Sequence, residues 1–161
     1  MYEAMARIIA GWAVANEQEI REGLAALEAS STVLVGPHFL ALLAETMANA
    51  GQTTPALSAV DEAIELVHRN NEGYYLAELY RLRGELLFAG GAEQAAASLK
   101  QSIEIAERQL AQSWCLRTAM SLVRLYGDDK SREFLLSVYN NFTEGFDTPD
   151  LLDARQLLKN N

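Results

Sequence analysis

Few side chains in this sequence have the type and spacing that a catalytic or metal site requires. Cys115 is the single cysteine, and Arg117 lies two residues away. A reactive thiolate would need such a cation beside it, but a lone cysteine on an apolar helix is usually a small core residue. Asp128 and Asp129 could ligate a metal, yet adjacent acids before a helix more often serve as charges at its start. We therefore expect neither a nucleophile nor a metal site.

Two further classes of enzyme are disfavoured by spacing. His38 and His68 lie 30 residues apart and form no His-Glu-x-x-His motif, which a zinc hydrolase would carry on one helix. A phosphate-binding P-loop places glycine directly before lysine, and none of Lys100, Lys130 and Lys159 follows a glycine. The sequence predicts a chain that is not an enzyme and needs no cofactor.

Composition places the chain among ordinary globular proteins. Its 161 residues suit one domain covering 1–161, and 50% are hydrophobic against 22% charged. A net charge of −9 disfavours binding to nucleic acid. The apolar stretch 8–15 imitates a signal peptide, but Glu3 precedes it and polar residues follow at once, so an amphipathic helix fits better. We expect a cytoplasmic protein without a membrane segment.

Small residues recur along the chain in two parallel series. The first series is spaced by 33, 40 and 37 residues, and the second by 33, 39 and 36. The members are Gly11, Ala44, Gly84 and Ser121 in the first series, and Gly23, Ala56, Ala95 and Ser131 in the second. A small residue repeated in both series is what two closely packed helices need, so each unit is predicted to be a helical hairpin. A bundle without a repeat would explain the helices but not these series.

The pattern predicts an all-α fold of four helix pairs and a final helix. The pairs are expected at 3–15 with 18–30, 37–50 with 54–69, 73–89 with 92–110, and 113–126 with 129–142. The corresponding repeats span about 3–30, 37–70, 73–110 and 113–142. Thr148, Pro149 and Asp150 together form a helix start signal, which predicts a last helix over 148–159.

The second repeat resembles the tetratricopeptide (TPR) repeat. Its residues fit the 34-residue pattern of large, small and turn positions at Leu40, Leu43, Ala44, Met47, Gly51, Ala56, Val60 and Ala63. The third repeat is similar, and the first and fourth are looser. This resemblance implies a right-handed solenoid of antiparallel helix pairs.

Residues 7 to 158 also resemble the C-terminal helical-repeat region of bacterial signalling proteins that carry a class III adenylate/guanylate cyclase domain and an AAA-type ATPase module. The resembling stretches are Gly11-Trp12-Ala13, FLALLAETMANAGQ (39–52), LYRLRGELLFAGG (79–91) and NFTEGFDTPDLLDARQLL (141–158). The resemblance implies a regulatory part of such a protein rather than its enzyme.

A helical solenoid offers a concave groove lined by the first helix of each pair. The groove positions expected from the TPR pattern include Trp12, Asn16, His38, Glu45, Asn49, Glu78, Arg81, Glu85 and Phe88, together with Ile8, Ala41, Thr118, Leu122 and Leu125. The lysines with which peptide-clamping TPR proteins grip a carboxylate are absent. Trp12 could anchor a partner or simply pack under the first hairpin, and Tyr74, Tyr75 and Tyr80 could equally bind or pack.

The two ends of the predicted solenoid differ. Leu151, Leu152, Leu157 and Leu158 are expected to cover the last hairpin, whereas the N-terminal edge has no cover and could form a homodimer. The leading interpretation is a noncatalytic protein-interaction or regulatory domain with a protein or peptide partner. The alternatives are a free-standing adaptor, a small-ligand sensor with a polar groove site, and a structural spacer.

Overall fold

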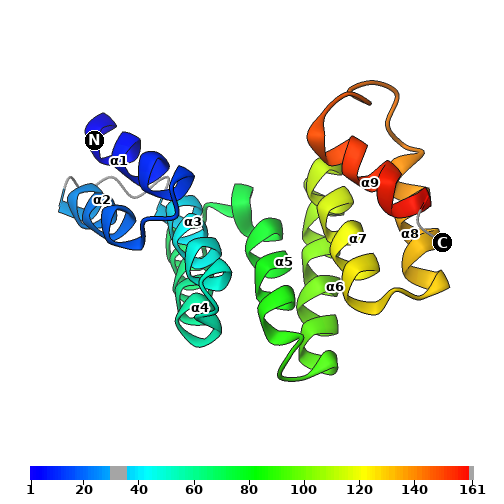
Figure 1. The fold of residues 1–161 in the computed structure, drawn as a ribbon, viewed down its shortest axis with the longest axis horizontal. Helices are drawn as coiled ribbons and strands as arrows, with labels where there is room; N and C mark the ends of the chain where they lie inside the picture. Colours follow the sequence, from blue (N-terminus) through cyan, green and yellow to red (C-terminus); the bar gives the residue numbers. More distant parts are fainter. Residues whose placement is uncertain (30–35, 160–161) are drawn as a thin grey trace.

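The computed structural model describes residues 1–29 and 36–159, and within them every regular element is helical (Figure 1). The elements are α1 (Tyr2–Ala13), α2 (Glu17–Ala29), α3 (Gly36–Asn49), α4 (Thr53–Asn70), the 3₁₀ turn η1 (Gly73–Tyr75), α5 (Leu76–Leu87), α6 (Ala92–Arg108), α7 (Gln112–Tyr126), α8 (Asp129–Tyr139) and α9 (Pro149–Lys159). The all-α prediction is confirmed for this part of the chain.

The helices pack in sequential pairs. The most extensive contacts join α1 to α2, α3 to α4, α5 to α6 and α7 to α8, and each pair also contacts the next. The first helices touch as well, α1 with α3, α3 with α5 and α5 with α7. Figure 1 shows the pairs following one another in chain order, with the N-terminus and α9 at opposite ends. This arrangement is consistent with helical repeats.

The glycines of the two series lie where the helices of a pair approach closely. A Cβ on Gly23 would sit 2.5 Å from Ile8 Cγ1 and 3.0 Å from the Ala4 carbonyl oxygen, and a Cβ on Gly84 would sit 2.6 Å from Leu99 Cγ. All eight members of the two series are buried. The prediction that small residues allow close packing is therefore confirmed for Gly11, Gly23 and Gly84.

Helix ends differ from the sequence prediction by one to three residues at most places. The first helix ends at Ala13, because Ala15 turns the chain with a φ of 54°. The predicted helix over 73–89 begins instead as η1 and ends at Leu87, and the one over 129–142 stops at Tyr139. Residue 30, the predicted end of the second helix, lies outside the described residues.

The core has two clusters that share side chains. One is formed by residues of α1–α5 together with Tyr75, and the other by residues of α5–α9. Leu76, Tyr80 and Trp114 pack against both. The last helix contacts α7 and α8 and buries Leu151 and Ala154. Leu152 was expected to share this role but is 42% exposed, because its position faces away from α7 and α8. The helix α9 nevertheless lies against both helices of the fourth pair.

None of the helices in the described part of the chain is both long and apolar enough to cross a bilayer.

Candidate functional site

A groove of about 810 Å³ lies across the first helices of three pairs, α1, α3 and α5. Its lining residues are Trp12, Ala13, Ala44, Glu45, Ala48, Asn49, Arg81, Leu82, Glu85 and Leu86. Five of the predicted groove residues are therefore brought together here. The added members are alanines and leucines, which give the groove apolar walls around a polar centre.

The repeat explains why three of these side chains meet. Trp12, Glu45 and Glu85 each directly follow the small residue of their own first helix, Gly11, Ala44 and Gly84. Equivalent positions of stacked repeats form a column on one face. The small residue faces the partner helix of its own pair. The residue after it lies about 100° further around the helix and therefore faces the groove.

Trp12 and Glu45 form the outer part of the groove. The indole Nε1 of Trp12 donates a hydrogen bond of 3.1 Å to Glu45 Oε2, and 45% of the Trp12 surface stays exposed. Burial raises the pKa of the Glu45 carboxyl above its ordinary value. The positive charge of Arg81 and the hydrogen bond from Trp12 each lower this pKa, but they offset only part of the rise. The groove thus holds a poorly solvated carboxylate beside a fixed aromatic ring.

Arg81 forms the floor of the groove within a buried charge network. Its Nε and Nη2 donate to the two carboxylate oxygens of Glu78 at 2.8 Å each, and Nη1 donates to Glu85 at 2.6 Å. Glu78 was predicted to line the groove, but it is 1% exposed and lies beneath it. Burial alone would lower the pKa of Arg81, yet the bonds and charges of Glu78 and Glu85 raise it, so the guanidinium stays charged.

Three residues of the fourth pair and α9 complete the network. Arg117 donates to Asp150 at 2.8 Å and forms an ion pair with Glu78 at 3.4 Å. The Ser121 hydroxyl donates to Glu85 at 2.6 Å. The sequence analysis did not predict these contacts. The bonded residues are 33 to 39 positions apart in the chain, and such a separation does not identify contact partners. By contrast, the 78-81-85 spacing is an ordinary intrahelical signal.

The other predicted groove residues lie elsewhere. Asn16 accepts the Glu19 backbone N–H at the start of α2, and the Phe88 ring packs on Tyr126. Ile8, Ala41 and Thr118 are fully buried, because each sits three residues before the small residue, on the face turned into the packing. Leu122 and Leu125 are half-buried outside the groove lining.

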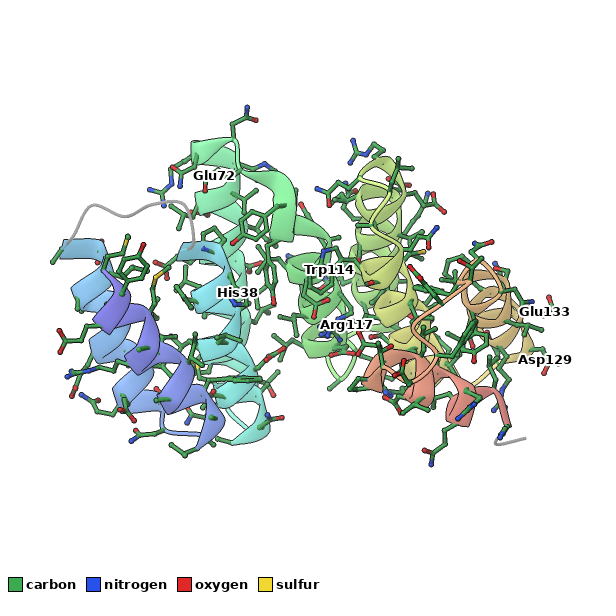
Figure 2. All side chains as sticks on the ribbon, turned by 90° about the horizontal axis from the view of Figure 1, so that it is seen from above. His38, Glu72, Trp114, Arg117, Asp129 and Glu133 are labelled. Atoms are coloured by element: carbon green, nitrogen blue, oxygen red, sulfur yellow. The ribbon has the colours of Figure 1, made fainter. Side chains whose placement is uncertain are left out.

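An aromatic cluster adjoins the charge network at Arg117. Tyr75 contacts His38 with ring centroids 4.7 Å apart and Trp114 at 5.3 Å, and the Arg117 guanidinium lies 5.2 Å from the Trp114 ring centroid. Figure 2 shows His38, Trp114 and Arg117 in the middle of the molecule. Burial lowers the pKa of His38, whose Nδ1 has no hydrogen-bond partner in the described part of the chain. This histidine is a packing residue, and Tyr75 is core, whereas Tyr74 is exposed.

The remaining chemical candidates have structural roles. Cys115 is buried, and burial raises the pKa of its thiol to about 11, so it is protonated at neutral pH. Asp128 caps α8 by accepting the Ser131 backbone N–H at 2.8 Å. Asp129 and Glu133 lie on α8 at the edge of the molecule opposite α1 and α2 (Figure 2). Among the described residues no group of three or more His, Cys, Asp or Glu side chains is arranged to hold a metal ion.

Comparison with known proteins gives one informative match. An uncharacterized protein of Rhizobium meliloti is 32% identical to this chain over 127 residues. The match takes in 73% of this chain but only 12% of the relative, so the chain spans about an eighth of that protein's length. No protein-family model matches the chain. No solved structure matches it either.

Proposed function

We propose that this chain is a noncatalytic protein-interaction domain of TPR-like architecture that binds a peptide segment of a partner in the groove of α1, α3 and α5. The observation that carries the proposal is the half-exposed Trp12, held by Glu45 over a groove with apolar walls. Tryptophan is enriched among the few residues that carry most of the binding energy at protein interfaces. Asn49 adds an amide that can both donate to and accept from a peptide backbone.

The proposed architecture is a right-handed solenoid of helix pairs. Contacts between successive first helices support it, because such a row forms the inner layer of a solenoid and leaves a continuous groove along the stack. The buried Glu78–Arg81–Arg117 network links α5, α7 and, through Asp150, α9. We infer that it fixes the angle between the third and fourth pairs, and hence the shape of the groove floor.

We further propose that the chain acts as the regulatory C-terminal region of a larger bacterial signalling protein of the cyclase and ATPase type. The length of the Rhizobium meliloti relative supports this, since nearly nine-tenths of that protein lies outside the matched segment. In such a protein the groove would couple partner binding to an upstream module in the cytoplasm. Any cyclase or ATPase activity would reside in those other domains.

Selection from a random peptide phage library on the full chain tests the binding function. We expect enriched peptides whose binding is lost in Trp12→Ala and weakened in Asn49→Ala. Tyr2→Ala, which removes a more exposed aromatic side chain (80% against 45% for Trp12) from the same helix, should leave binding unchanged. Enrichment of no peptide, or of peptides insensitive to Trp12→Ala, would refute the proposal.

A small-ligand sensor remains the second candidate because of one observation. The groove volume of about 810 Å³ falls within the range of small-molecule sites, and its centre is polar. A metabolite screen by thermal shift, with the exposed groove residue changed in Asn49→Ala, separates the two functions. Stabilisation of the wild type alone by a metabolite would favour the sensor.

The exposed face of α1 suggests a second contact. Tyr2, Ile9 and Val14 are at least half exposed and give α1 an apolar outer face. We propose self-association through this edge. Sedimentation velocity at two concentrations should show a dimer at the higher one, and a monomer at both would reject this proposal.

A further inference from the structure

The groove and the charge network beneath it together carry an unbalanced negative charge. Four carboxylates, those of Glu45, Glu78, Glu85 and Asp150, share the site with the two guanidinium groups of Arg81 and Arg117. Both cations are already engaged by Glu78, Glu85 and Asp150 through bonds of 2.6 to 3.4 Å. The groove and this network therefore hold two more negative than positive charges, and the groove lining itself has Glu45 and Glu85 against Arg81.

Glu45 is where a further cation would be accepted. It forms no ion pair with any described residue, and its one hydrogen-bond donor is the neutral Trp12 indole at 3.1 Å. The second carboxylate oxygen, Oε1, receives no donor from the described residues. A carboxylate that has lost solvent without gaining a counter-ion is unfavourable, so a bound cation would be stabilised strongly there.

The surroundings of Glu45 match a long cationic side chain. The Trp12 ring lies beside the carboxylate, and tryptophan faces attract ammonium and guanidinium groups. Ala44, Ala48 and Leu82 form apolar walls against which the methylene stem of lysine or arginine can pack. The chain's net charge of −9 would also attract a basic segment from a distance.

We propose that the groove recognises an arginine or lysine side chain within an extended basic peptide segment, with Glu45 as the counter-ion and Trp12 against the cation. Arg81 serves as a positioning residue, because its bond to Glu85 keeps that second carboxylate on the groove floor. The inference rests on the proposed peptide-binding function and names the chemistry of the partner.

Two heptapeptides that differ only at the central residue test the inference. One carries arginine and the other citrulline, which keeps the shape of the side chain but is neutral. Binding to the full chain is followed by NMR through the Trp12 indole N–H signal, assigned by its loss in Trp12→Phe. We expect the arginine peptide to bind at least tenfold more tightly, as one charge-assisted contact would give. Added salt should weaken that binding and not the binding of citrulline.

Two single-residue variants test whether Glu45 is the carboxylate that binds the peptide's arginine. Glu45→Gln keeps the acceptor for Trp12 but removes the charge, so it should weaken the arginine peptide about tenfold and leave the citrulline peptide unchanged. Glu65→Gln removes a carboxylate from the exposed face of α4 and should change neither affinity. Equal binding of the two peptides, or an affinity for arginine that Glu45→Gln does not alter, would overturn the inference.

Two further peptides separate this inference from the function on which it rests. Their central residue is leucine or glutamate. If either binds more tightly than the arginine peptide and loses binding in Trp12→Ala, the groove is a peptide site but not a cation site. If none of the four peptides shifts the Trp12 signal at millimolar concentration, the cation inference is overturned, and the phage selection alone decides the function.

Discussion

Replacing Glu78 by glutamine should expose how much the buried charge network contributes to stability. The carboxylate is 1% exposed and receives three charged contacts, two of 2.8 Å from Arg81 and one of 3.4 Å from Arg117. Glutamine has nearly the same shape but one acceptor oxygen and no charge. Both guanidinium groups would keep a second carboxylate partner, so the loss should fall at the lower end for a broken buried pair, about 3 kcal/mol.

Urea and thermal unfolding, followed by circular dichroism, measure this loss. For a domain of this size about 3 kcal/mol corresponds to a fall in Tm of about 6–12 °C. Glu65→Gln, on the exposed face of α4, is the matched control and should shift Tm by less than about 2 °C.

A double-mutant cycle tests whether the pair acts as a unit. Replacing both Glu78 and Arg81 by methionine leaves no unpaired charge between them, so the double variant should lose less stability than the two single variants added together. Additive losses, or a Glu78→Gln variant within about 0.5 kcal/mol of wild type, would refute the view that these charges depend on one another.

Four further outcomes are expected. Leu151→Ala should destabilise the chain by about 2–5 kcal/mol in urea unfolding, because it opens a cavity under α9, and a loss below about 1 kcal/mol would contradict the covering role. Gly84→Ala should cost about 1–3 kcal/mol through overlap with α6, while Gly91→Ala, where a Cβ meets no atom within 4 Å, should be near neutral; equal losses would refute the close-packing argument. The Cys115 thiol, with a pKa of about 11, should react slowly with a disulfide reagent at pH 8 until urea unfolds the chain, and rapid reaction in the folded state would show the thiol to be accessible. Because burial raises the pKa of Glu45 in the folded chain, its ionisation destabilises the fold as pH rises above the unfolded value of 4.5; Glu45→Gln should thus be more stable than wild type at pH 7 and equal at pH 4, and a pH-independent difference would argue against this ionisation.

The expected gain from Glu45→Gln bears on function. A carboxylate held beside Trp12 at a cost to stability is the pattern of a residue kept for binding. If the same substitution stabilises the chain and weakens the arginine peptide, both results have one cause, namely a charge that lacks its counter-ion in the unbound protein.

Helix positions and pairing could be predicted from the sequence because both depend on local chemistry. Apolar residues at helical spacing and small residues such as Gly23 and Gly84 report the face along which two neighbouring helices touch. Pro149 begins α9 as predicted, since a proline at the first helical position loses no hydrogen bond. The apolar spacing and the small residues together therefore predict which side chains are buried between the two helices of a pair.

Only some of the residues that line the groove could be predicted from the sequence. Trp12, Glu45 and Glu85 share the position after a small residue, so the column that faces the groove was contained in the repeat. The position three residues before the small residue is buried in every pair, as Ile8 and Thr118 show. Arg81 occupies this same buried position and yet reaches the groove floor, because its long side chain extends out of the packing toward Glu85.

The sequence by itself determined the helices, their order in pairs and the close contacts within each pair, because those contacts join residues one hairpin apart and leave a periodic trace. Only the tertiary structure decided that Glu78 lies beneath the groove and that Arg117 and Asp150 complete its charge network. These contacts cross from one pair to the next and to α9, and their geometry depends on how the pairs are rotated against one another. No spacing along the chain encodes that rotation, since it results from the packing of all the side chains between the pairs.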